Sequence, residues 1–234
     1  MMTEDNVFKI FKVNLHSDVK EIPLPYFERK YYVIDNFYET PDEVNNYIDQ
    51  YANYTLFKAG IEGSLNGIKF SDKRHNKLIS SMKEVSDIIM KVCGARSLRS
   101  DPTQLLTNTF QMHDKEWNNW KDNWWWPHLD HGWTCLIYLN KEGCEGTNLY
   151  HKKGFPKQMG LVKGLDNVIR KGTEANAEHV KPWIPKEQWH CAHTMESKYN
   201  RAVIFPSRIY HGQNIASDRW FDEIRRNQVV FMEL

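Results

Sequence analysis

The segment PHLDHG, which contains His128 and Asp130, runs directly into an apolar stretch at residues 133–139 that has the composition of a β-strand. Residues two positions apart on a strand point to the same side of a sheet, so these two side chains can bind one ion together. A second His-x-Asp triplet begins at His16, but no sustained strand follows it. The triplet alone is therefore weak evidence for an ion-binding site, and the strand-like stretch that follows Asp130 is the feature that favours one.

A third candidate ligand, His211, ends the strand-like segment VIFPSRIYH much further along the chain. Two histidines and one carboxylate can occupy one face of an octahedron and leave open positions, which is typical of Fe(II) sites that activate dioxygen. The sequence therefore predicts His128, Asp130 and His211 as metal ligands and as the catalytic residues. The competing interpretation is a coincidental cluster of core side chains.

Helical patterns lie in the first half of the chain, and strand patterns dominate the second. We expect a strand at 31–37 and two helices at about 41–51 and 76–92, the second with its C-cap at Gly94. Short strands follow at 104–112, 133–139, 147–150, 201–205 and 227–232. This order predicts an α+β chain, mainly β with flanking helices. We expect a single domain over 1–234, with helix-rich support at 1–100, a β core at 101–234, and an insertion or lid at 151–198.

The composition limits the possible partners and compartment. Hydrophobic residues make up 41% and aromatic residues 13% of the chain, so it is not a disordered sequence. A net charge of +1 gives no overall basic excess, and a nucleic-acid partner is therefore not expected. The sequence shows no apolar signal segment, no membrane-spanning stretch and no C-x-x-C pair among its scattered cysteines. We expect a cytoplasmic protein without a membrane partner, and the sequence leaves its oligomeric state open.

The order of these motifs resembles the Fe(II)/2-oxoglutarate-dependent dioxygenases, and most closely the prolyl-hydroxylase-like branch with its small phage and bacterial members. The resemblance rests on the His-x-Asp strand, the segments GTNLY and RAVIFPSRIYH, and an arginine-bearing last strand. It covers about residues 31–234, with 151–198 unmatched. It implies a double-stranded β-helix (jelly-roll) core, with Fe(II), 2-oxoglutarate and O2 as cofactor and cosubstrates. The implied reaction hydroxylates an unactivated C–H bond of a small-molecule or peptidyl substrate, with succinate and CO2 as coproducts.

The same resemblance implies a basic residue on the last strand that pairs with the distal carboxylate of 2-oxoglutarate. Arg226 matches that position best. Gln228 stands where the family often has serine or threonine, and the interval from the last histidine is longer than usual, so Arg225 and Arg219 are alternatives. Tyr138 shares strand parity with the His-x-Asp pair, and we predict that its hydroxyl reaches the cosubstrate. Ordinary core packing is the alternative for this tyrosine.

Two other interpretations use different residues. Tryptophans crowd residues 117–133, and we expect them to pack and to form a substrate wall rather than to stack on bases, because acidic side chains balance the few lysines there. These tryptophans could also serve a non-catalytic jelly-roll protein that binds a ligand. His190, Cys191 and His193 could bind zinc, although they lack the usual two-plus-two spacing. Strand alternation predicts Cys191 and His193 on one face and His190 on the other.

Overall fold

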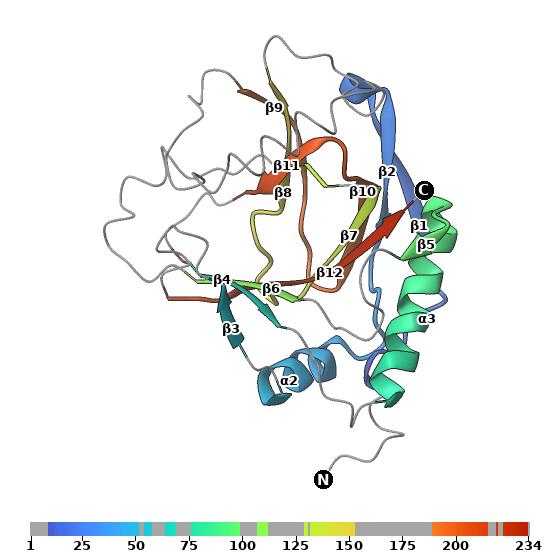
Figure 1. The fold of residues 1–234 in the computed structure, drawn as a ribbon, viewed down its shortest axis with the longest axis vertical. Helices are drawn as coiled ribbons and strands as arrows, with labels where there is room; N and C mark the ends of the chain where they lie inside the picture. Colours follow the sequence, from blue (N-terminus) through green and yellow to red (C-terminus); the bar gives the residue numbers. More distant parts are fainter. Residues whose placement is uncertain are drawn as a thin grey trace.

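The computed structural model describes residues 9–51, 54–57, 64–68, 76–98, 107–111, 129–130, 132–152, 189–214, 219 and 222–233. Within these ranges the chain forms two antiparallel β-sheets with helices beside the larger one (Figure 1). The two helices are α2 (Pro41–Tyr51) and α3 (Asn76–Cys93), and a short 3-10 turn, η1, covers Pro25–Phe27.

The larger sheet has nine strands, of which eight follow the order β1-β2-β10-β7-β12-β6-β4-β3, while β5 pairs with β12. All of its pairings are antiparallel. Its strands are β1 (Val19–Leu24), β2 (Arg29–Ile34), β3 (Tyr54–Phe57), β4 (Ser64–Ile68), β5 (Ser97–Leu98), β6 (Thr107–Gln111), β7 (Trp133–Tyr138), β10 (Arg201–Pro206) and β12 (Arg225–Glu233). The smaller sheet has the order β11-β8-β9 and contains β8 (Thr147–Lys152), β9 (Trp189–Met195) and β11 (Tyr210–Gln213).

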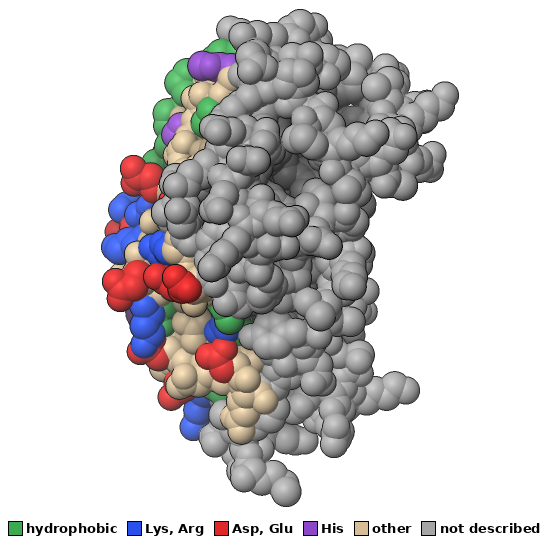
Figure 2. Space-filling model, turned by 90° about the vertical axis from the view of Figure 1, so that its left-hand side faces the viewer, with side chains coloured by type: hydrophobic (Ala, Val, Ile, Leu, Met, Phe, Trp, Pro, Cys, Tyr) green, Lys and Arg blue, Asp and Glu red, His purple; other side chains and the backbone are tan. Residues whose placement is uncertain are grey.

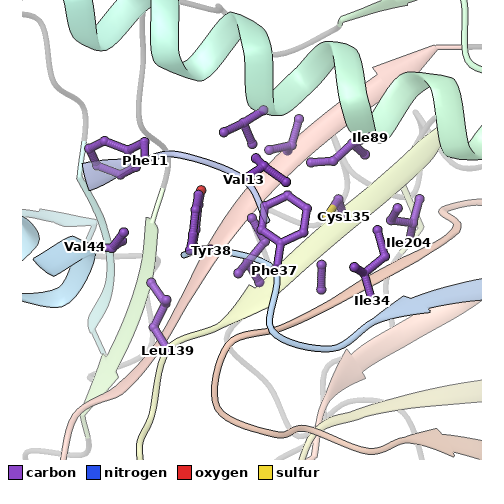
Figure 3. Packing of buried hydrophobic residues seen from close by; sticks show 14 of the residues in the cluster. Phe11, Val13, Ile34, Phe37, Tyr38, Val44, Ile89, Cys135, Leu139 and Ile204 are labelled. Carbon is purple, nitrogen blue, oxygen red and sulfur yellow. The ribbon is translucent and has the colours of Figure 1, made fainter. Parts of the chain in front are cut away.

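Strand alternation divides the buried side chains into two clusters, one on each face of the larger sheet. On β7, Cys135 and Ile137 belong to the cluster that also contains residues of α2 and α3 (Figure 3). The intervening Leu136 and Tyr138 belong to the other cluster, together with Leu149 of the smaller sheet. We call the first face the helix face and the second the inner face. The inner face lies between the two sheets. Because side chains alternate along a strand, only every second residue of a strand in the larger sheet points into that space.

The helix α3 forms because its apolar residues repeat every three or four positions. Val85 and Ile89 are fully buried against the larger sheet, and each such side chain contributes about 1.5–3 kcal/mol by leaving water. Gly94 ends the helix with a φ of 71°, and the Ala95 amide donates to the Met90 carbonyl at 3.0 Å. The predicted C-cap at Gly94 is therefore confirmed.

The sequence predicts both helices and the strands β2, β6, β7, β8, β10 and β12, but the strands β1, β3, β4, β5, β9 and β11 are not among the predicted strands. The bounds of α2 agree with the prediction, and the predicted strands in the second half appear as β6, β7, β8, β10 and β12. The segment of β1 contains a proline and exposed charges, which are common on edge strands but give no clear strand pattern in the sequence. The strand β9 lies inside the predicted insertion 151–198, yet it pairs with β8 in the smaller sheet. Residues 153–188 of that insertion lie outside the described ranges.

Surface chemistry on the described part of the chain is mixed. Figure 2 shows Lys and Arg side chains interspersed with Asp and Glu side chains on one face, with histidines among hydrophobic side chains at its upper end. None of the helices among the described residues is both long and apolar enough to cross a membrane.

A bidentate ion pair fastens the end of β2 to the start of β10, and it makes stability depend on pH. Arg201 donates from Nε to Asp35 Oδ1 at 2.7 Å and from Nη2 to Oδ2 at 3.2 Å. The hydrogen bonds from Arg201 are the main cause that lowers the pKa of the Asp35 carboxyl below its usual 3.8. Since the folded state has the lower pKa, this stabilisation is present above pH 3.8 and disappears as the pH falls through the folded-state value.

We therefore expect Asp35→Asn to lower the free energy of unfolding by about 1–2 kcal/mol at pH 7 and to have a smaller effect at acid pH, as the carboxyl of the wild type becomes protonated. Urea unfolding at pH 7 and at acid pH measures the difference. Glu21→Gln is the control, because the Lys30–Glu21 pair is roughly half-exposed and contributes little. An equal loss of stability from Asp35→Asn at both pH values would show that the charge is not the cause.

Candidate metal and cosubstrate site

Backbone pairing beyond the strand ends brings Asp130 beside His211. The Asp130 amide donates to the Ser207 carbonyl at 3.0 Å, and the Ser207 amide donates to the Gly132 carbonyl at 2.9 Å. These bonds extend the β7–β10 ladder, and the chain then turns into β11, which contains His211. The Oδ2 atom of Asp130 lies 3.4 Å from Nε2 of His211. Two of the three predicted metal ligands are therefore neighbours.

A backbone contact fixes the tautomer and the orientation of the His211 imidazole. Its Nδ1 lies 2.9 Å from the Ile209 carbonyl oxygen, which can only accept, so Nδ1 carries a proton and donates it. In a neutral ring the lone pair is then on Nε2, which faces the Asp130 carboxylate. A metal cation could accept electron pairs from both of these atoms. A backbone carbonyl that fixes the tautomer is also the usual support of a metal-binding histidine, so the donor set fits a metal ion.

The surroundings of the pair differ on its two sides. The His211 side chain is only 5% exposed, and its ring meets that of Phe205 edge to face at 4.9 Å. The Asp130 side chain is 29% exposed and therefore marks the more open side of the pair. Close to the backbone of Asp130, the buried hydroxyls of Thr134 and Ser207 lie 2.6 Å apart and connect β7 to the turn after β10. The histidine is thus held rigidly, while the carboxylate borders the open side.

The third predicted ligand, His128, lies outside the described residues. Among the residues that the structure describes, no group of three His, Cys, Asp or Glu side chains converges on one point. The structure thus brings together Asp130 and His211, and the full triad stays a prediction.

Arg225 is a buried cation on the inner face. Its side chain is 2% exposed. Its Nη1 donates to Asn227 Oδ1 at 3.0 Å and its Nη2 to the Gly146 carbonyl at 2.9 Å, while its buried Nε has no hydrogen-bond partner in the part of the chain that the structure describes. A guanidinium stays charged at any ordinary pH, and a buried charge is costly unless it is paired. Within the described ranges no carboxylate pairs with Arg225.

Further polar atoms lie on the inner face together with Arg225. The hydroxyls of Tyr138 and Thr147 lie 2.9 Å apart. Burial raises the pKa of Tyr138, and the nearby cation of Arg225 opposes this only in part, so the phenol keeps its proton. Gln213 lies opposite Thr147 in the β8–β11 ladder, two residues from His211, and its buried Oε1 has no hydrogen-bond partner. Unsatisfied buried polar atoms usually mark a site for water or a ligand.

The structure places Arg226 elsewhere. Successive residues of β12 alternate between the two faces, and Arg226 points to the helix face, where it contacts α2. Its Nη2 lies 2.5 Å from Asp49 Oδ1, and its Nη1 lies 3.3 Å from Asn45 Oδ1. Arg219, the other alternative, donates to the Gly143 carbonyl at 2.7 Å and pairs with Glu223. Of these three arginines, the structure brings only Arg225 to the face of Tyr138.

The proposed zinc ligands do not converge. The β8–β9 ladder has a bulge between Leu149 and Tyr150, which shifts the register: Leu149 faces His193, whereas Tyr150 faces Cys191. Directly paired residues share a face, so His193 lies on the inner face with Leu149, and Cys191 lies on the other. The expectation that Cys191 and His193 share a face is therefore wrong, because the bulge reverses the parity. His190 instead packs its ring against Tyr26 at 5.7 Å.

The close packing of the chain just before β7 requires glycine at position 132. Its φ is 70°, and a Cβ atom at this position would lie 1.9 Å from the Met232 carbonyl oxygen. Gly143 has a φ of 71°, but a Cβ there would meet nothing within 4 Å. We expect Gly143→Ala to cost about 1 kcal/mol, the left-handed backbone penalty alone. Gly132→Ala should cost at least about 3 kcal/mol, because the strand end must also move.

Urea unfolding of the two glycine variants measures this difference, since both change the same residue type at the same φ. Equal costs would show that the close approach to Met232 does not constrain the chain before β7.

Comparison with known proteins gives the fold class first. The non-heme alpha ketoglutarate dependent epimerase SnoN from nogalamycin biosynthesis aligns over 87% of this chain and 78% of its own, with a TM-score of 0.50 and 14% identity. At that identity the match shows a shared fold. Two further matches are structurally more distant: the alpha ketoglutarate dependent carbocyclase SnoK (TM-score 0.44, 17% identity, 87% and 79% covered) and a Pseudomonas putida prolyl-4-hydroxylase (0.38, 9%, 100% of both).

The sequence family is also defined. The model described as "Family of unknown function (DUF6445)" matches residues 16–227, and the chain belongs to this family. No curated protein matches the chain by sequence.

Proposed function

We propose that this protein is an Fe(II)- and 2-oxoglutarate-dependent oxygenase with His128, Asp130 and His211 as the metal ligands. The observation that carries the proposal is the Asp130–His211 pair, in which a carboxylate oxygen and an imidazole lone pair face each other at 3.4 Å. A third ligand from the same strand entrance would complete an open site for iron. The two facing sheets are consistent with a double-stranded β-helix core, which we include in the proposal.

The proposal assigns the distal carboxylate of 2-oxoglutarate to Arg225, in place of Arg226. Arg225 is the buried cation on the inner face, and its free Nε can donate to an anion between the sheets. Tyr138 would add a neutral hydroxyl donor beside the same carboxylate. Gln213, two residues from His211 on β11, would add a further polar group on the inner face.

Iron and 2-oxoglutarate, when bound, supply an oxidant strong enough for an unactivated C–H bond, and 2-oxoglutarate is converted to succinate and CO2. The protein's own residues bind, orient and exclude water. His211 presents a lone pair at a fixed angle, because Ile209 and Phe205 hold its ring. Asp130 adds negative charge on the open side. The apolar inner cluster, including Leu136, keeps water from the pocket. The substrate is a small molecule or a peptidyl side chain.

The test adds Fe(II) and 2-oxoglutarate to the purified protein without oxygen and looks for a visible metal-to-ligand charge-transfer band. Admission of oxygen should then produce succinate. A protein that binds 2-oxoglutarate but gives neither band nor succinate would be a non-catalytic binding module. Failure to bind either Fe(II) or 2-oxoglutarate would reject the proposal.

A further inference from the structure

A polar pair that the proposed iron chemistry does not use lies on the inner face, in line with His211. His211 pairs with Leu149 in the β8–β11 ladder, and Leu149 pairs with His193 in the β8–β9 ladder. The three residues therefore form one row across the smaller sheet, and directly paired residues share a face. Two strand spacings separate the histidine backbones by roughly 10 Å. His193 thus faces the same space as the candidate metal ligand.

Tyr31 of β2 meets His193 across that space. The Tyr31 hydroxyl lies 3.2 Å from His193 Nε2, and the two ring centroids are 5.4 Å apart. Tyr31 belongs to the inner cluster, whereas Tyr32, the next residue on the strand, packs against the helix-face cluster. The pair therefore bridges the two sheets beside the pocket.

Whichever residue donates in the Tyr31–His193 hydrogen bond, the pair keeps one unused hydrogen-bond donor and one unused acceptor. If Tyr31 donates to Nε2, the ring keeps an Nδ1–H donor and the phenol oxygen can accept. If Nε2–H donates to Tyr31, the phenol keeps its O–H donor and Nδ1 can accept. Within the described residues, the Tyr31–His193 contact is the one side-chain hydrogen bond that these two groups make. A ligand group that both donates and accepts would satisfy both remaining positions.

The surroundings favour a ligand group without charge. Burial lowers the pKa of His193 and raises that of Tyr31, so both side chains are neutral near pH 7. The nearby inner-face residues include Val33, Phe205 and Met195, all in the apolar cluster. Two charged side chains, Arg201 and Glu196, act on the pair from nearby, but Arg201 is already paired with Asp35 and Glu196 is exposed. Neither provides a buried counter-ion, so desolvating a carboxylate or an ammonium group there is costly.

We propose that the Tyr31–His193 pair is a substrate-recognition site that binds an uncharged hydroxyl or carboxamide group beside the candidate iron centre. This inference rests on the proposed function, because it assigns the substrate to that pocket. The pair fixes one polar group of the substrate, so the C–H bond that reacts lies within a few bonds of that group. Free amino acids with both charges intact are poor ligands, whereas amides and alcohols fit.

The test measures binding of matched small-molecule probes to the anaerobic Fe(II)–2-oxoglutarate complex by ligand-observed NMR. Each probe set has the same ring or chain and differs in one group: benzamide, benzoate and benzylammonium form one set, and butanamide, butanoate and butylammonium another. We expect the carboxamides to bind at least about tenfold more tightly than the charged members. Charged probes that bind equally well, or no binding by any carboxamide, would overturn the proposal.

Tyr31→Phe removes one oxygen atom and should reduce the carboxamide preference about tenfold, as expected for the loss of one hydrogen bond. Tyr32→Phe is the matched control, because it removes the same atom on the helix face of the same strand and should leave the preference unchanged. Thermal unfolding verifies that both variants are folded. A Tyr31→Phe protein that retains the full preference would assign the pair to structure alone. Failure of the underlying function is distinct, because the wild type would then show no charge-transfer band.

Discussion

Replacing His211 with glutamine is expected to reduce the affinity for Fe(II) by at least about a hundredfold, as measured by anaerobic isothermal titration. The imidazole presents its Nε2 lone pair next to Asp130 only because Nδ1 is committed to the Ile209 carbonyl. Glutamine is similar in size but has a weak amide oxygen in place of the imidazole lone pair. The variant should therefore remain folded while it loses the metal.

A second variant and a control make this prediction specific. Asp130→Asn keeps the shape of the side chain and removes its negative charge, so it should weaken metal binding by a comparable factor. His16→Gln is the matched control, since His16 begins the other His-x-Asp triplet and its side chain is exposed. Wild-type Fe(II) affinity in the folded His211→Gln protein would remove this histidine from the metal site.

Replacing Arg225 with lysine is expected to raise the KM for 2-oxoglutarate by about ten- to a hundredfold, equivalent to one charged hydrogen bond. Lysine keeps the positive charge that the buried site contains but has no planar fork for two parallel bonds to a carboxylate. The kcat at saturating 2-oxoglutarate should change much less, because the metal ligands are not altered. Initial rates of succinate formation over a range of 2-oxoglutarate concentrations measure both constants.

Arg226→Lys is the control for this experiment, because the same change is made one residue away on the opposite face. It weakens the contacts with Asp49 and Asn45 and should lower stability while leaving the KM nearly unchanged. The reverse outcome, with the KM sensitive to Arg226 and not to Arg225, would return the cosubstrate anchor to the residue that the sequence favoured.

The sequence could indicate which face of β7 Tyr138 occupies, because residues two apart on a strand share a face and the His-x-Asp triplet gives the reference position. His-x-Asp parity, continued along β7, predicts Tyr138 on the same face as Asp130, and the structure places this tyrosine on the inner face. The helices α2 and α3 were also predictable, since one face of each is apolar and their ends have clear signals. In both cases the residue pattern within a single segment is enough to make the prediction.

For the strand β12, the residue pattern of the segment does not predict which face each side chain occupies. Both of its faces are buried, so Val229 and Val230 are both apolar and the sequence gives no parity reference. The choice between Arg225 and Arg226 then depends on pairing with β7, which is a long-range contact. The bulge in the β8–β9 ladder is a similar case, because a single extra residue reverses which side chains of β9 face inward.

The two adjacent arginines at the start of β12 connect a surface helix to the space between the two sheets. Arg226 is fastened to α2 through Asp49, whose side chain is 59% exposed, and the adjacent Arg225 is the proposed cosubstrate anchor. Any shift of α2 along the sheet therefore moves the backbone that positions the anchor. A binding partner or a modification on the outer side of α2 would change the affinity for 2-oxoglutarate from a distance, and 2-oxoglutarate would change the affinity for that partner by the same factor.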